Sequence, residues 1–216
     1  QKEEAKVDLK AKYEVIVFAD ENADIIISGK PSPTSPFARF ITEVPPEYEG
    51  GIGKEGVEAL KSFVEKGGIL VTLNNACEVA YREFTGAPAR NALERVDRTK
   101  FFCPTSILKI IVDNQSPLGY GLPKETAAMF SNSLAFNTMI PSGEWDRKVV
   151  ASYPEEDILL SGWLLGEEAI ARTAAVVDTK YKKGHIILIG IRCQFRAQSH
   201  GTYKFLLNSL LYPEIE

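Results

Sequence analysis

Two short apolar runs constrain this chain more than any other feature of its sequence. Residues 13–18 (YEVIVF) and Ile69–Leu73 are rich in Val, Ile and Leu and are bounded by polar or glycine-containing segments. Runs of this length and composition fill strands of a parallel sheet that is buried on both faces. The chain is therefore expected to belong to the α/β class.

Helical patterns alternate with these strands. In residues 54–66 the apolar side chains Val57, Leu60, Phe63 and Val64 recur at helical spacing, and Gly67 follows as the left-handed stop that such helices favour. Further elements are expected in the rest of the chain. They are strands at 24–27 and 107–112, short helices after 73 and at 91–98, a hairpin formed by 174–179 and 185–191, and a last helix at 202–211.

Length and composition favour a single domain over residues 1–216. The chain has 216 residues, of which 44% are hydrophobic, which is enough for one well-packed core. Five prolines and several Gly and Ser residues fall between residues 30 and 53, so this segment is expected to be a long surface loop.

The charge pattern excludes two classes of partner. The formal net charge is -4 and there is no polybasic stretch, so binding to nucleic acid or to an anionic membrane surface is not expected. No apolar run approaches the roughly 20 residues of a membrane span. The chain opens with QKEEAKVDLKAK, which has neither the apolar core of a signal peptide nor an initiator Met, and this predicts a fragment of a larger polypeptide.

Cysteine and histidine are too few and too scattered for a metal centre. Cys77, Cys103 and Cys193 form no C-x-x-C pair, which argues against a disulfide framework or a zinc knuckle. A hydrolytic zinc site needs about three ligands in recognisable spacing, and the only histidines are His185 and His200. We expect no metal or other cofactor in this chain, and an exposed or edge position for His185 at the start of its strand.

Cys77 is the candidate nucleophile because it lies where a strand becomes a helix, a usual place for ligands and nucleophiles in α/β sheets. The neighbouring carboxylate of Glu78 disfavours a thiolate, and the glycines of a nucleophile elbow are missing. A structural thiol is the favoured interpretation, with an activated thiol as the alternative.

Two further segments are candidate ligand-binding sites. Ser161 and Trp163 flank a glycine and either line a pocket or form a tight turn with a packed Trp. Arg192 and Arg196 follow the strand at 185–191, where they could clamp a carboxylate with forked donors or pair with acidic neighbours. The sequence leaves both alternatives open, with the structural one favoured in each case.

Three motifs carry a family resemblance that runs over nearly the whole chain. They are PPEYEGGIG at 45–53, SGWLLG at 161–166 and RAQSHGT at 196–202. With the order of the strands, they resemble the class I glutamine amidotransferase-like domain that follows the catalytic domain in large bacterial M14-type zinc carboxypeptidases. The resemblance implies a flavodoxin-like, three-layer sandwich with a mainly parallel sheet and a C-terminal hairpin, lacking its first β-α unit.

The same resemblance implies a domain without catalysis. Active members carry a Gly-x-Cys-x-Gly elbow and a His-x-Glu pair after the last strand, whereas here Cys77 lacks the glycines and residues 192–195 (RCQF) replace the pair. The expected function is an accessory domain that packs on the preceding peptidase domain, which would hold the zinc, in a periplasmic or secreted protein. A homodimer through an uncovered sheet edge is a further expectation. The alternatives are a cysteine-dependent hydrolase or amidotransferase that uses Cys77 with His200 as its base, and a ligand-binding module.

Overall fold

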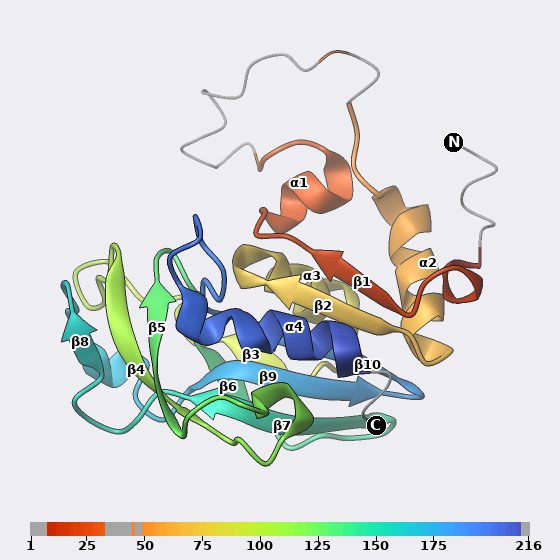
Figure 1. Ribbon diagram of the computed structural model, residues 1–216. Helices are drawn as coiled ribbons and strands as arrows, with labels where there is room; N and C mark the ends of the chain where they lie inside the picture. The colour runs from red at the N-terminus through yellow and green to blue at the C-terminus, as the bar shows by residue number, and fades with distance from the viewer. Residues whose placement is uncertain (1–7, 33–44, 46–48, 213–216) are drawn as a thin grey trace.

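The protein forms a mixed β-sheet with helices on both faces of one half, as the computed structural model shows (Figure 1). The structure describes residues 8–32, 45 and 49–212. The α-helices in this part of the chain are α1 (Ala23–Ser28), α2 (Gly53–Glu65), α3 (Cys77–Glu83) and α4 (Tyr203–Leu211). None of them is long and apolar enough to cross a membrane.

The sheet has ten strands among the described residues. They are β1 (Val15–Phe18), β2 (Ile69–Leu73), β3 (Ala89–Asn91), β4 (Ser106–Val112), β5 (Glu125–Phe130), β6 (Phe136–Thr138), β7 (Trp145–Ser152), β8 (Leu159–Ser161), β9 (Ala174–Tyr181) and β10 (Gly184–Ile189). Their main order is β1-β2-β10-β9-β7-β4-β5, while β6 pairs with β3 and β9, and β8 pairs with β4.

The expected mainly parallel three-layer sandwich is wrong. Only β1 with β2 and β2 with β10 are parallel, and every other strand pair is antiparallel. A parallel connection needs a crossover of a dozen or more residues, usually a helix. Residues 84–199 are all described and contain no α-helix, so β3 to β9 are joined by turns and by loops, two of which include a short 3₁₀ helix. The predicted C-terminal hairpin is confirmed as β9–β10.

Several local predictions are confirmed. Helix α2 buries Val57, Leu60, Phe63 and Val64, and Gly67 follows it with φ 102°. The runs at 13–18 and 69–73 form β1 and β2, and the helices expected after 73 and at 202–211 are α3 and α4. The loop predicted from 30 to 53 lies mostly outside the described residues.

Two local predictions are wrong. The run at 24–27 is helical in α1, because the Asn22 side chain accepts a hydrogen bond from the Asp24 amide and Gly29 ends the helix with φ 75°. Residues 91–98 are not a helix. Asn91 ends β3, and its side chain accepts a hydrogen bond from the Leu93 amide, which stabilises a turn.

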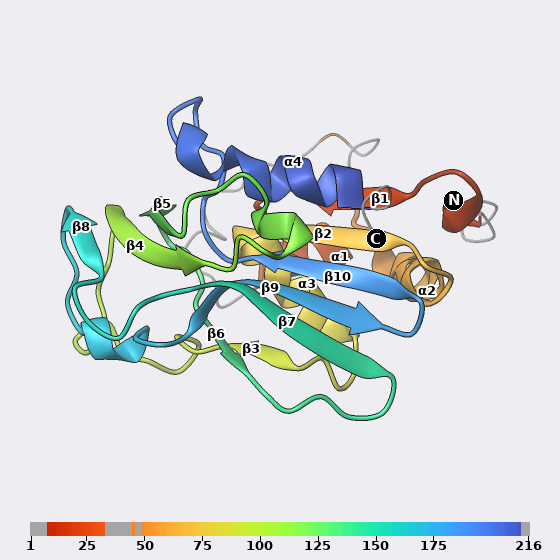
Figure 2. The ribbon, with the colours of Figure 1, turned by 60° about the horizontal axis from the view of Figure 1, so that its bottom comes forward.

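The two faces of the parallel part have separate cores. On one face, α2 and α3 pack against Leu70, Ile186 and Leu188 of the sheet. On the other face, Phe205 of α4 packs in a cluster with Val71 and other sheet residues. Figure 2 shows α4 on one side of β2 and β10, while α2 and α3 do not share that side. The antiparallel part continues from β9 through β7 and β4 to β5, and α4 also contacts the 3₁₀ turn Pro117–Gly119 between β4 and β5.

Candidate functional site

Cys77 is a buried core residue. It is the first residue of α3 and has no exposed surface, and its Sγ–H donates to the Thr72 carbonyl over 3.3 Å. Burial raises the pKa of the thiol to about 12. A helix N-terminus can lower a thiol pKa, but here desolvation outweighs that effect. The thiol is therefore protonated at neutral pH and out of reach of a substrate.

The strained residue of the strand-to-helix turn is Asn74 and not Cys77. Asn74 directly follows β2 and has φ 50°, whereas Cys77 has the helical φ of -58°. In a nucleophile elbow the nucleophile occupies the sharp, strained turn between strand and helix. The position that matches an elbow is thus filled by an amide side chain, which cannot act as a nucleophile.

A small pocket opens at the carboxyl ends of the three parallel strands β1, β2 and β10. It encloses about 80 Å³. Its wall includes Asp20 after β1, Asn74 after β2, and Arg192, Phe195 and Arg196 after β10. The carboxyl ends of parallel strands are where open α/β sheets bind ligands. The structure therefore brings the two predicted arginines to a position suited to a ligand.

Asp20 organises this pocket. One carboxylate oxygen, Oδ2, lies 2.8 Å from Arg192 Nη1 and accepts from Asn74 Nδ2 over 3.1 Å. The other, Oδ1, accepts from the Asn75 backbone amide and from Asn75 Nδ2 over 3.2 and 2.9 Å. One carboxylate thus holds the loops after three strands together. Sequence reasoning missed Asp20 and Asn74, although both follow predicted strands closely.

The two arginines differ in their environment. Arg192 is about one-fifth exposed and is fixed by Asp20, by a hydrogen bond from its Nε to the Ser131 carbonyl, and by the Phe195 ring 5.1 Å from its guanidinium carbon. Arg196 is exposed and has φ 48°. Among the described residues, no carboxylate forms an ion pair with Arg196. Arg192 is a structural partner of Asp20, while Arg196 keeps its charge available.

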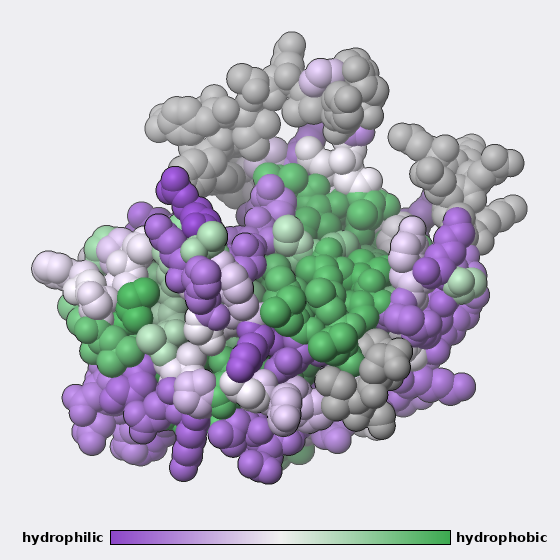
Figure 3. Space-filling view, in the orientation of Figure 1, coloured by the Kyte–Doolittle hydropathy of each residue, from purple (hydrophilic) through white to green (hydrophobic). Residues whose placement is uncertain are grey.

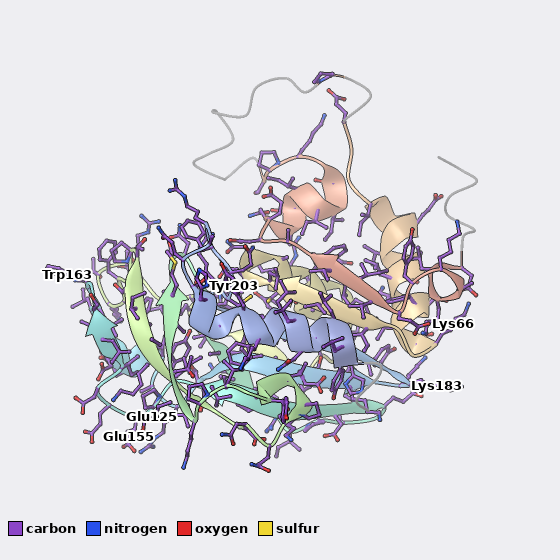
Figure 4. All side chains as sticks on the ribbon, viewed as in Figure 1. Lys66, Glu125, Glu155, Trp163, Lys183 and Tyr203 are labelled. Carbon is purple, nitrogen blue, oxygen red and sulfur yellow. The ribbon has the colours of Figure 1, made fainter. Side chains whose placement is uncertain are left out.

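The other predicted site residues lie elsewhere. Ser161 is exposed at the end of β8, and Trp163, 64% exposed, follows it; neither lines the pocket. The backbone of Trp163 is fixed by Ser106, whose hydroxyl donates to its carbonyl and accepts from its amide. Figure 4 shows Trp163 at the β8 end of the molecule, away from Lys66 and Lys183.

Neither histidine is placed to act as a base for Cys77. His200 is exposed, its Nε2 lies 2.8 Å from the Ala197 carbonyl, and its ring stacks on Tyr203, whose position at the start of α4 is labelled in Figure 4. His185 is 5% exposed in the middle of the sheet, so the expected exposed or edge position is wrong. Its Nδ1 lies 2.7 Å from Asp178 Oδ1 on β9.

The described residues contain no group of three or more His, Cys, Asp or Glu side chains that could hold a metal ion.

An exposed apolar surface covers α4 and the neighbouring strand β1. Leu207, Leu210 and Leu211 of α4 are 52%, 44% and 56% exposed, and Val17 of β1 is 39% exposed. Helix α4 instead uses Phe205 and Ser209 as its buried residues. Figure 3 shows a continuous hydrophobic area at the place of β1 and α4. We call Val17, Leu207, Leu210 and Leu211 the leucine surface.

Comparisons with solved structures find several proteins that resemble this chain. A cytoplasmic protein from Salmonella typhimurium superposes with a TM-score of 0.52 at 12% identity, over 95% of this chain and 73% of that one. A β-galactosidase from Bacillus circulans sp. alkalophilus gives 0.52 at 13% identity, over 97% of this chain and 24% of the enzyme. A protein described as ThuA-like from Bacteroides uniformis gives 0.45 at 15% identity, over 93% and 69%.

No protein-family model matches the chain, and no curated protein matches it in sequence. At these identities the two likenesses with a TM-score of 0.52 show the fold alone. The chain spans about a quarter of the length of the β-galactosidase.

Proposed function

We propose that this chain is a non-catalytic, amidotransferase-like accessory domain that packs through its leucine surface on another domain of a larger polypeptide. The observation that carries the proposal is the orientation of α4. A helix that packs on one side normally places its apolar side chains on that side, whereas α4 buries Phe205 and also leaves Leu207, Leu210 and Leu211 exposed near Val17. Contiguous exposed apolar surface of this kind is typical of an interaction site.

The state of the amidotransferase-like site supports an absence of catalysis. Cys77 is buried and protonated, and the elbow position holds Asn74. Nucleophilic catalysis requires a thiolate or hydroxyl with a base in hydrogen-bond reach, and His200 instead contacts Ala197 and Tyr203. These observations argue against the alternative of a Cys77-dependent hydrolase.

The likeness to the β-galactosidase supports an accessory role in a second way. In that enzyme the same fold accounts for about a quarter of the polypeptide, so it occurs within a much longer chain. For the present chain, the sequence resemblance described above favours an M14-type zinc carboxypeptidase domain as the partner. Zinc would then belong to the partner domain.

Hydrogen exchange of the full-length gene product and of the present chain tests the proposal. We expect the amides of α4 and β1 to exchange more slowly in the full-length protein, because a docked domain suppresses local opening. Equal exchange in both would overturn docking at the leucine surface. If the full-length gene product contains no domain beyond this chain, docking to another domain of the same polypeptide would equally be overturned.

A matched pair of variants in the full-length protein sharpens the test. The double variant Leu207→Ser, Leu210→Ser removes two residues of the leucine surface, whereas Leu160→Ser removes an equally exposed leucine from β8. We expect only the double variant to restore fast exchange and to change the carboxypeptidase rate or its thermal inactivation. The same effect in the Leu160 variant would show that the change does not depend on the leucine surface.

A further inference from the structure

Strand β1 ends the sheet, and one of its two sides is unpaired among the described residues (Figure 1). It pairs only with β2, in parallel, with Val15 beside Ile69, and the Ile69 amide donates to the Glu14 carbonyl over 3.0 Å. Because the polar groups of successive strand residues point to opposite sides, the amides and carbonyls of Val15 and Val17 point away from β2. These groups have no backbone partner in the described part of the chain.

The composition of β1 is that of an interior strand. All of its positions are apolar, in the order Val-Ile-Val-Phe. Strand β5, at the other end of the main strand order, instead alternates between exposed and buried positions and begins with the exposed Glu125. Solvent-exposed edge strands are usually protected by charged residues, by Pro, by a bulge or by short length. Apart from its short length, β1 has none of these features, which favours a further strand at its side.

Uncovered apolar surface flanks β1 on both faces of the sheet. On the α4 face, Val15 packs on the core while Val17, 39% exposed, belongs to the leucine surface. On the other face, Ile16 and Phe18 pack on the cluster of α2 and α3 and also form part of a groove of about 750 Å³. The apolar side chains that line this groove are Leu9, Ile16, Phe18, Ile52, Ala59 and Leu60. A strand beside β1 would point its side chains alternately toward these two surfaces.

We propose that the partner domain adds an extended segment to the outer edge of β1, and that this segment is apolar on both of its faces. Main-chain hydrogen bonds to Val15 and Val17 provide affinity in this mode of recognition, and the surfaces for alternate side chains provide specificity. A segment that alternates apolar and polar residues does not fit, because its polar side chains would be buried against one apolar surface without partners. The inference rests on the proposed accessory function and names the element that the partner contributes.

A second copy of the chain fits this edge less well than a strand of another domain. Two β1 strands could pair about a two-fold axis, with Val15 opposite Val17 of the other copy. In each copy, however, Ile16 and Phe18 already pack on that copy's own cluster of α2 and α3. They are therefore not available to fill the groove of the other copy, and apolar surface would stay uncovered in both.

Hydrogen exchange resolved to single amides, in the full-length gene product and in the present chain, tests the proposal. In the present chain we expect fast exchange at Val15 and Val17 and slow exchange at Ile16 and Phe18, whose amides face β2. In the full-length protein, exchange at Val15 and Val17 should slow at least about tenfold, because each amide then donates to the added strand. Docking on the leucine surface alone would not produce this pattern at alternate residues.

Proline variants verify the direction of each amide. Proline has no N–H and is tolerated in an edge strand where that N–H points away from the sheet. In the present chain, Val17→Pro should leave exchange in β2 unchanged, whereas Ile16→Pro removes an amide that faces β2 and should accelerate it. In the full-length protein, Val17→Pro should abolish the slow exchange at Val15. The control Val17→Thr keeps the amide and should retain slow exchange there.

The outcomes separate this inference from the proposed function. Fast exchange at Val15 and Val17 in the full-length protein, together with slowed exchange in α4, would overturn strand addition and leave the docked leucine surface in place. Slow exchange at Val15 and Val17 already in the present chain would also overturn strand addition by a partner domain. It would assign the edge to the chain itself, or to a second copy if the effect grows with concentration. Unchanged exchange in both β1 and α4 would overturn the proposed function as well.

Discussion

His185 Nδ1 lies 2.7 Å from Asp178 Oδ1 across the pair of strands β10 and β9, and both side chains are less than a tenth exposed. The second carboxylate oxygen, Oδ2, accepts a hydrogen bond from the Tyr212 hydroxyl over 2.8 Å. Tyr212 directly follows α4, and its ring meets that of His185 edge-on at 5.1 Å. This buried network ties the end of the last helix to the middle of the sheet.

Replacing Asp178 by Asn should therefore destabilise the fold. An amide offers one acceptor and one donor group where the carboxylate offers two acceptors, so the contacts with His185 Nδ1 and with the Tyr212 hydroxyl cannot both be kept unchanged. We expect the free energy of unfolding to fall by about 1–3 kcal/mol, the typical cost of disrupting a buried polar contact. Urea titration measures the change. The control is Asp146→Asn at an exposed position of β7, which should change stability by less than about 0.5 kcal/mol.

The cysteines should resist alkylation in the folded protein. Burial raises the pKa of Cys77 and of Cys193 to about 12, and it also raises that of Cys103. Since the thiolate is the reactive form, iodoacetamide should modify Cys77 only when the protein opens, with Cys103, the most exposed of the three at 7%, reacting first. Peptide mass spectrometry measures the alkylation rate of each cysteine from pH 5 to 9. Fast labelling of Cys77 with a midpoint well below about 8.5 would restore it as a nucleophile.

The sequence predicted those parts of the fold that depend on local pattern. Helix α2 with its Gly67 stop, the strands β1, β2 and β4 and the β9–β10 hairpin all follow from periodicity and turn residues. The three successive isoleucines at 25–27 were misleading, because the caps at Asn22 and Gly29 outweigh the strand propensity of those residues. Strand pairing was also misjudged, since the sheet order depends on contacts between distant segments.

The site was predictable only in part. Arg192 and Arg196 could be identified because they follow a strand, and the structure places both at one pocket. Cys77 was a candidate because a thiol can act as a nucleophile. The strained backbone, however, lies three residues earlier at Asn74, and only the dihedral angles reveal it. The link from Asp20 to Asn74, Asn75 and Arg192 joins residues more than 50 positions apart, beyond the reach of motif analysis.

The ionised carboxylate of Glu78 should lower the free energy of unfolding at neutral pH. Burial raises the pKa of its carboxyl above the ordinary value of 4.5, although Arg82, 3.8 Å away, partly opposes this shift. The folded state then binds a proton more tightly than the unfolded state, so the contribution of Glu78 to stability is fully present below pH 4.5 and is lost as pH rises through the folded pKa.

The variant Glu78→Gln tests this linkage. Its side chain has no charge to desolvate, so the variant should be more stable than the parent at pH 7, by less than about 1 kcal/mol because the site is partly solvated. The gain should disappear below pH 4.5, where Glu78 is protonated. Denaturant unfolding at both pH values measures the difference. An equal gain at both would show that the effect arises from helix propensity rather than from charge.

Substitutions on the two sides of α4 should change the stability of the isolated chain by very different amounts. Phe205 is fully buried on the sheet, and Phe205→Ala should cost about 3–5 kcal/mol of unfolding free energy, as for other large core residues. Leu207→Ser and Leu210→Ser lie on the leucine surface and should change stability by less than about 0.5 kcal/mol, while they reduce self-association at high concentration. Thermal unfolding and sedimentation velocity measure the two quantities. A large loss of stability in the Leu207 variant would mean that this face of α4 is packed within the chain, and the accessory role would then lose its docking surface.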